Sequence, residues 1–209
     1  MRYSTIVLLK ILVWAACLGP LAWLVFHAVR NTLGPDPTAT ITFTTGLVTL
    51  RLLTISLAIS PVRKLIPKLA WMIRFRRLLG LFAFFYATLH LVTWVALYAG
   101  FDLRAMESDV FKRRFITVGM LAWLLLLPLA ATSTNWAIRK LGGGRWSRLH
   151  KLVYAAAVCG VIHYWWQVKP GVLTPTTITI VIGALLLARP VIALAQRRKG
   201  IATSKIANV

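Results

Sequence analysis

Residues 78–98 read LLGLFAFFYATLHLVTWVALY, and this stretch decides the fold. It contains no acid, no lysine and no arginine, and its one histidine is His90. A helix of about 20 apolar residues is long enough to cross the hydrocarbon core of a bilayer. Because backbone polar groups in lipid must be satisfied within the chain, the stretch predicts a membrane-spanning helix with an ionisable side chain inside it.

Five further apolar stretches resemble this one. The chain has 209 residues, of which 59% are hydrophobic, and its mean hydropathy of +0.76 is far above that of a soluble domain. No loop is long enough to form a soluble domain of ordinary size. The sequence therefore predicts a single all-α domain over residues 1–209, an integral membrane bundle of six transmembrane helices. These spans cover approximately residues 11–29, 46–66, 78–98, 115–136, 149–166 and 176–195.

Charged residues fall into two groups along the chain. Most lysines and arginines lie in alternate loops, and the net charge is +21. All four acids lie in the remaining loops, at Asp36, Asp102, Glu107 and Asp109. The positive-inside rule then places the basic loops, and with them both termini, in the cytoplasm. The charge indicates topology and contact with anionic membrane lipids, so no nucleic acid is expected as a partner.

A second buried histidine, His163, lies in the predicted span 149–166. His90 lies about 12 residues from the inner end of its span and His163 about 13 residues beyond His150, so both lie roughly 18–20 Å deep. Neutral imidazole is the commonest metal ligand, and two imidazoles at one depth predict a heme iron held between them. A helix–helix hydrogen bond is the alternative for each histidine, and a catalytic zinc would need a third ligand.

Three more residues lie at the inner membrane level. His150 begins its span, where a histidine is either solvated or ligates a second, inner heme. Arg76 lies about four helical turns before His90 on nearly the same helix face, and Arg77 follows it. A guanidinium stays protonated and is a poor iron ligand, but it pairs well with propionates and phosphates. These residues predict an inner site, formed by His150 with Arg76 or Arg77, for a heme, a quinone or a flavin.

Two candidate features lie toward the outer side. Arg51, about one to two turns inside the outer end of the span 46–66, either extends to the interface or pairs with a heme propionate. The outer loop 101–114 combines three acids with the basic run Lys112–Arg114. We expect this loop to be a docking surface for a partner outside the membrane.

Three stretches of the sequence resemble a known family. They are RRLLGLFAFFYATLHL at residues 76–91, LPLAATST at 127–134 and RWSRLHKLVYAAAVCGVIHYWW at 145–166. They resemble the MsrQ (YedZ) family, the heme-binding membrane subunits of bacterial MsrPQ protein-methionine-sulfoxide reductase systems. That family belongs to the ferric-reductase-like transmembrane group, which includes the membrane part of NADPH oxidases. The resemblance covers nearly the whole chain.

The resemblance implies a multi-pass protein of the bacterial inner membrane. It implies electron transfer from the respiratory quinone pool, through heme b, to MsrP, a periplasmic molybdopterin enzyme that repairs methionine sulfoxide in oxidised proteins. A cytoplasmic flavin reductase stays open as a second donor, and an FMN has been associated with the family. Catalytic reduction would take place on MsrP, and no catalytic residue is predicted in this chain.

The family's histidines and paired arginines correspond to five residues of this sequence, namely His90, His150, His163, Arg76 and Arg77. NADPH oxidases carry two histidines on the helix that here carries His90, whereas the inner position here is arginine. One heme is therefore expected, and a second with unconventional ligands stays open. Two other functions also stay open: a stand-alone ferric or other metal reductase, and a non-redox membrane scaffold or transporter.

Overall fold

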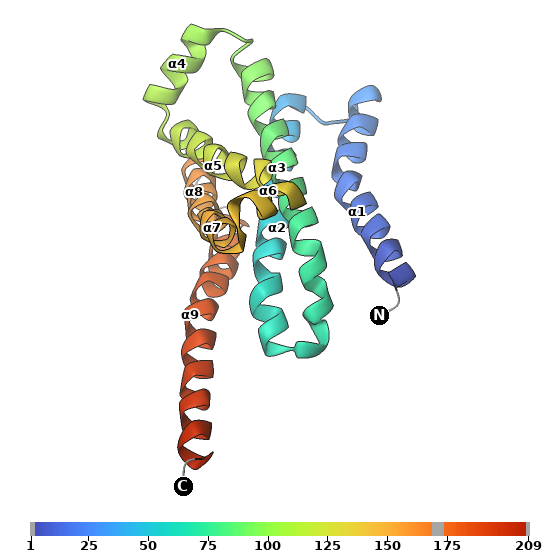
Figure 1. Cartoon of the computed structure of the whole chain (residues 1–209). Coiled ribbons are helices and arrows are strands. Elements are labelled where there is room, and N and C mark those ends of the chain that lie inside the picture. The colour runs from blue at the N-terminus through green and yellow to red at the C-terminus, as the bar shows by residue number, and fades with distance from the viewer. Residues whose placement is uncertain (1–2, 169–173, 208–209) are drawn as a thin grey trace.

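The computed structural model describes residues 3–168 and 174–207, and helices account for almost all of them (Figure 1). In chain order the elements are α1 (Tyr3–Val29), α2 (Pro37–Leu65), the 3₁₀ helix η1 (Pro67–Phe75), α3 (Arg76–Thr93), the π-helix η2 (Trp94–Tyr98), α4 (Leu103–Lys112), α5 (Arg114–Ala131), α6 (Asn135–Leu141), α7 (Gly143–Leu149), α8 (Leu152–Gln167) and α9 (Thr174–Ala207). The predicted all-α class is confirmed.

Two helix pairs form the centre of the bundle. α2 packs along α3, α5 packs along α8, and α9 lies against α2 and α8. The start of α1 and the end of α9 lie on the same side as the turn from α2 to η1, opposite α4 (Figure 1). This arrangement agrees with the predicted placement of both termini on one side of the membrane.

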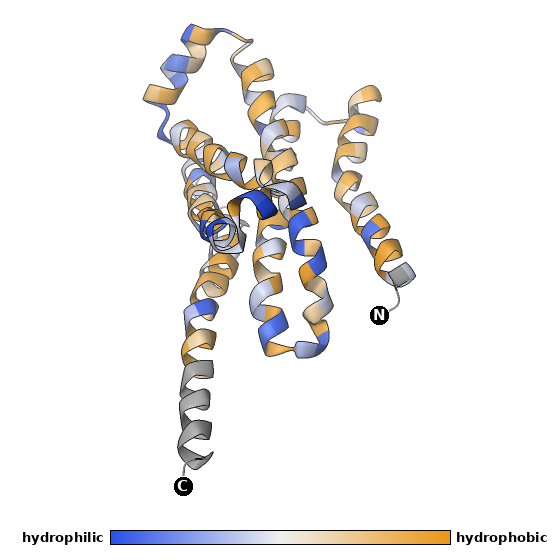
Figure 2. Ribbon diagram, viewed as in Figure 1, coloured by the Kyte–Doolittle hydropathy of each residue, from blue (hydrophilic) through white to orange (hydrophobic). Residues whose placement is uncertain are grey.

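Apolar residues cover both the inside and the outside of the bundle. Leu57, Ala83, Tyr86 and Ala157 are almost completely buried where the central helices meet. Large apolar side chains such as Leu187 remain exposed, and hydrophobic residues make up most of the long helices (Figure 2). A soluble monomer rarely exposes large apolar patches, so these faces fit a lipid environment.

Helix lengths agree with most of the predicted spans. Five helices of the described chain are long and apolar enough to cross a membrane: Ser4–Val29, Pro37–Leu65, Pro67–Tyr98, Arg114–Ala131 and Pro175–Ala195. The remaining predicted span, 149–166, corresponds to α8, a helix of 16 residues. Its length is about 24 Å, short of the roughly 30 Å of hydrocarbon. The prediction of six spans is therefore consistent with the structure, but α8 does not reach full length.

Two segments predicted as loops are largely helical. The inner segment 62–77 contains the end of α2 and the whole of η1, and the outer segment 101–114 contains α4. α4 begins at the cap residue Asp102, whose side chain accepts a hydrogen bond from the backbone N–H of Arg104. Such capping satisfies a backbone donor that the helix itself cannot. Short polar helices of this kind lack the apolar length on which the sequence prediction relied.

Tyr86 fastens α1 to the bundle. Its hydroxyl donates to the carbonyl of Cys17 at 2.7 Å and accepts from the backbone N–H of Leu21 at 3.1 Å. These two backbone groups would otherwise pair within α1, so the phenol is inserted into the helix next to Pro20. Proline and an inserted side chain are both known causes of an opened helical turn.

Arg189 fastens α9 in a similar way. Pro61 has no N–H, so the carbonyl of Leu57 in α2 lacks its usual helical donor. Nη2 of Arg189 donates to that carbonyl at 2.7 Å, and Nη1 donates to the hydroxyl of Tyr154 at 2.6 Å. One side chain therefore connects α9 to both α2 and α8.

Candidate functional site

The structure brings His90 of α3 and His163 of α8 together. Their ring centroids are 5.8 Å apart and the ring planes are 84° to each other. Both rings line a cavity of about 320 Å³ between α2, α3, α5 and α8, which we call the outer cavity. Its other walls are mostly apolar and include Leu50, Met120 and Trp123.

Each of the two imidazoles is held through Nδ1 by a backbone carbonyl. His90 Nδ1 lies 2.9 Å from the oxygen of Thr42, and His163 Nδ1 lies 2.6 Å from the oxygen of Phe115. A carbonyl only accepts, so Nδ1 carries the proton and Nε2 keeps its lone pair. Neither Nε2 has a hydrogen-bond partner among the described residues. This is the tautomer and orientation that metal-ligating histidines adopt.

A glycine lies beneath each ring. Gly46 follows Thr42 by one helical turn in α2, and Gly119 follows Phe115 by one turn in α5. A Cβ atom on Gly46 would lie 3.0 Å from Cε1 of His90, and one on Gly119 would lie 2.6 Å from Nδ1 of His163. We call each carbonyl with its following glycine a histidine seat. An added Cβ would therefore displace the imidazole of His163 at Gly119 and press on the imidazole of His90 at Gly46.

The outer cavity suits a metal held by two protein ligands. In the described part of the chain, no group of three or more His, Cys, Asp or Glu residues is placed to hold a metal ion. Two imidazoles alone leave most of the coordination of a metal ion unfilled, and a porphyrin supplies the missing four nitrogens. The apolar lining, the two free Nε2 atoms and the histidine seats therefore fit a heme better than a bare ion.

A second cavity of about 360 Å³, the inner cavity, lies on the other side of Leu53 and Leu126, which line both cavities. The predicted inner residues His150, Arg76 and Arg77 all line it. Further lining residues that the sequence did not single out are Trp146, Lys151 and Tyr154. A single layer of leucine side chains thus separates the two cavities.

His150 is held differently from the outer histidines. Thr132 Oγ1 donates to the carbonyl of Pro128 at 2.6 Å, so it accepts from Nε2 of His150 at 3.1 Å. The indole of Trp146 stacks on the imidazole, with centroids 3.9 Å apart. His150 lies in the turn before α8, where burial, followed by the charge of Arg76, lowers its pKa below the ordinary value. The hydrogen bond to Thr132 places the proton of the neutral ring on Nε2.

The arginines of the inner cavity have only neutral partners. Arg76 Nη1 donates to Ser60 Oγ at 3.3 Å, and Arg77 Nη1 donates to Asn135 Oδ1 at 2.7 Å. All four Asp and Glu residues lie in the segments predicted to be outside, and none of their side chains pairs with Arg76 or Arg77 in the described structure. Uncompensated guanidinium groups around a cavity favour an anionic occupant, such as a carboxylate or a phosphate.

Arg51 does not join either site in the structure. Its side chain is exposed, and it is among the lining residues of neither cavity. The outer cavity instead has Arg113 at its edge, which the sequence analysis had placed only in a docking loop. The histidine seats were also missed, although glycines inside apolar helices are a known signal of close approach between helices.

Comparisons with known proteins agree with this architecture. The model of a family described as ferric reductase like transmembrane component matches residues 45–161, a range that ends just before His163. Three relatives share the name protein-methionine-sulfoxide reductase heme-binding subunit MsrQ. The one from Ralstonia nicotianae is 47% identical over 158 residues, 76% of this chain and 72% of the relative. The one from Rhodospirillum rubrum is 46% identical over 195 residues, 93% of each chain. The one from Herminiimonas arsenicoxydans is 44% identical over 194 residues, 92% of this chain and 88% of the relative.

Proposed function

Because this chain belongs to the MsrQ family of ferric-reductase-like transmembrane proteins, we propose that it is a membrane b-type cytochrome that supplies electrons to MsrP, a periplasmic methionine sulfoxide reductase. The relatives' name describes a heme-binding subunit of that reductase system. The observation that carries the proposal is the pair His90 and His163, whose rings lie 5.8 Å apart with each Nδ1 on a carbonyl.

His90 and His163 would hold the heme iron through their free Nε2 atoms. A bound heme supplies one-electron chemistry at its iron, and its potential depends on its ligands, burial and neighbouring charges. The two histidine seats fix the rings, which limits the movement of the ligands between oxidation states. The apolar side chains of the outer cavity exclude water and lower the local dielectric.

The inner cavity would receive the electrons. His150, Arg76 and Arg77 would bind an anionic or quinone-type group there, and a second heme, a quinone or an FMN are the candidates. The donor would be the quinone pool or a cytoplasmic flavin reductase. Since Leu53 and Leu126 line both cavities, the two sites would be close enough for direct transfer. The protein would span the bacterial inner membrane, with MsrP meeting its periplasmic side near α4.

The test is spectroscopic. We would record oxidised and reduced absorption spectra of the purified wild type, of His90→Ala and of His163→Ala, together with a pyridine hemochrome count. The proposal expects a low-spin b-type spectrum in the wild type that is lost in both variants. The count separates one heme from two.

Controls distinguish the competing functions. A folded wild type that stays free of heme after heme supplementation would overturn the proposal and favour a scaffold or a transporter. Reduction of ferric chelates without MsrP, at the rate reached with MsrP, would favour a stand-alone metal reductase. Electron transfer that requires MsrP would support the proposed role.

A further inference from the structure

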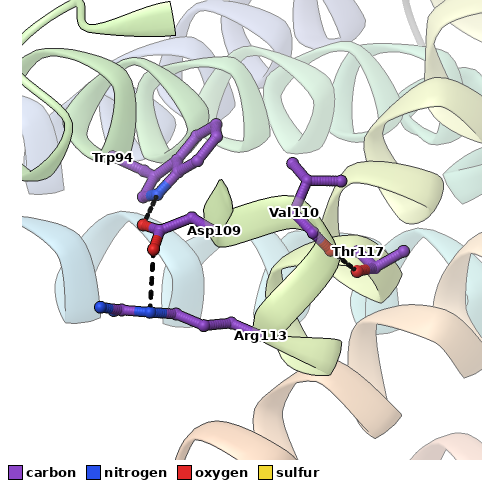
Figure 3. Close-up of polar contacts among 5 residues, drawn as sticks. All are labelled: Trp94, Asp109, Val110, Arg113 and Thr117. Atoms are coloured by element: carbon purple, nitrogen blue, oxygen red, sulfur yellow. Dashed lines mark hydrogen bonds and ion pairs between the residues drawn. The ribbon is translucent and has the colours of Figure 1, made fainter. Parts of the chain in front are cut away.

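A polar cluster of three residues borders the outer cavity, and two of its members line that cavity. It consists of Trp94 at the start of η2, Asp109 of α4 and Arg113 at the start of α5 (Figure 3). Figure 3 shows the Asp109 carboxylate between the other two side chains. Trp94 Nε1 donates to Oδ2 at 3.3 Å, and Arg113 Nε pairs with Oδ1 at 3.0 Å. Trp94 and Arg113 both line the outer cavity.

Asp109 connects the end of α3, the helix that carries His90, to the start of α5, whose Phe115 carbonyl holds His163. Trp94 follows His90 by about one helical turn, and Arg113 lies two residues before Phe115, whose carbonyl holds His163. A further hydrogen bond, from Thr117 Oγ1 to the carbonyl of Val110, attaches α4 to α5 in the same view (Figure 3). The short helix α4 therefore does more than link two spans, because it holds Arg113 at the cavity edge.

Arg113 is the only lysine or arginine that lines the outer cavity in the described part of the chain. Asp109 uses its Nε, and neither Nη group has a hydrogen-bond partner among the described residues. The side chain is 56% exposed, whereas Asp109 is 22% exposed. A guanidinium has five N–H donors in a planar fork that matches a carboxylate. Arg113 thus presents two unused donor groups at the edge of an apolar cavity.

We propose that Arg113 binds a propionate carboxylate of the porphyrin in the outer cavity and that Asp109, held by Trp94, orients it. This inference rests on the proposed heme function. A porphyrin with its iron between His90 and His163 carries propionate carboxylates that pair well with a guanidinium, and Arg113 is the one lysine or arginine that lines the outer cavity in the described residues. Asp109 is a positioning residue, since it acts through Arg113.

The same guanidinium chemistry would also attract a lipid phosphate at the membrane surface. The two anions differ in what they affect. A propionate contact changes the potential of the heme and its rate of release, whereas a lipid contact changes neither.

The experiment compares Arg113→Gln with Arg114→Gln, the adjacent exposed arginine, as a matched control. Two quantities are measured on purified holoprotein: the midpoint potential by redox titration, and the rate of heme transfer to excess apomyoglobin. Arg113→Gln should shift the midpoint to lower potential, because loss of a nearby positive charge favours the ferric form. It should also speed heme release about twofold to fivefold, the range expected for an exposed charge pair. Arg114→Gln should change neither quantity.

The role of Asp109 is tested by a double-mutant cycle. The shift caused by Arg113→Gln should be smaller in an Asp109→Asn background, because the arginine is no longer held at the cavity edge. An equal shift of the midpoint potential in both backgrounds would show that Asp109 does not orient Arg113. Arg113→Lys should have a midpoint potential between those of Arg113→Gln and the wild type.

Two outcomes would overturn the assignment of the propionate to Arg113. One is an Arg113→Gln variant with the potential and release rate of the Arg114→Gln control, and this result would point to a lipid anion. The other is failure of both Arg113→Gln and Arg113→Lys to give folded protein, since it would show that the residue is needed for folding. A wild type without heme would instead refute the proposed function itself, so the two failures are distinguishable.

Discussion

The outer and inner cavities are similar in volume and share a wall, yet they differ in how they hold histidine. In the outer cavity, Nδ1 of His90 and of His163 donates to a carbonyl and Nε2 stays free. In the inner cavity, Nε2 of His150 is engaged by Thr132 and its ring is stacked on Trp146. The outer cavity therefore presents two free Nε2 atoms, whereas the inner cavity presents cations and an imidazole whose Nε2 is engaged and whose ring is stacked.

This difference shows that position in a helix does not assign the role of a histidine. All three residues lie in or beside apolar spans, and the neighbouring backbone decides which nitrogen keeps its lone pair. The outer cavity is suited to hold an iron, and the inner cavity is suited to hold an anionic group. The variants below test this contrast, beginning with the largest effect.

Among substitutions that leave His90 and His163 in place, Gly119→Ala should lower heme binding most. The new Cβ would lie 2.6 Å from Nδ1 of His163, so the ring must leave its carbonyl. Changes to groups that orient a metal ligand weaken metal binding by about 10- to 100-fold. Heme content per protein, measured by hemochrome, should fall accordingly. Gly183→Ala is the matched control, because a Cβ there meets no atom within 4 Å. Equal heme contents would contradict the histidine seat.

Gly46→Ala should have the same effect to a smaller degree. Its Cβ would lie 3.0 Å from Cε1 and 3.1 Å from Nδ1 of His90, a distance that a slight ring movement relieves. We expect heme affinity to fall by about tenfold at most. If Gly46→Ala lowered heme affinity more than Gly119→Ala in the same heme titration, the distance from the added Cβ to the ring would not explain the size of the effect.

His150→Ala should leave the outer cavity intact. The variant removes the stacked ring from the inner cavity but touches neither histidine seat, so the low-spin spectrum of the outer heme should be unchanged. Electron delivery from the donor should slow, as measured by stopped-flow reduction of the heme. Disappearance of the outer spectrum would mean that His150 ligates the same iron, and the separation into two sites would be wrong.

Tyr86→Phe should affect neither cavity. It removes the hydroxyl between Cys17 and Leu21, and the loss of such buried hydrogen bonds costs about 1–3 kcal/mol. The thermal unfolding midpoint in detergent should fall, while the spectrum of the remaining folded protein stays that of the wild type. A changed spectrum would show that the attachment of α1 reaches the heme site.

Most of the helical content was predictable from the sequence, and so was the membrane setting. Runs such as 78–98 carry too little charge to be soluble, and the structure forms a helix over them. The short helices α4, α6 and α7 were not predicted, because they lack the apolar length of a span. The side chains of Asp102 and Thr134 cap α4 and α6. The heme role of the candidate residues stays a prediction.

The sequence by itself determined which residues are available for the site: two histidines inside apolar segments, and lysines and arginines that lie mostly in alternate loops. Those properties follow from the cost of burying charge in lipid, which acts on each segment separately. Only the tertiary structure decided which nitrogen of each ring is free, because Thr42 and Phe115 lie 48 residues from the histidines they hold. It likewise decided that Arg113, and not Arg51, lies at the outer cavity. Contacts between distant segments depend on how the helices pack, and no local pattern encodes that packing.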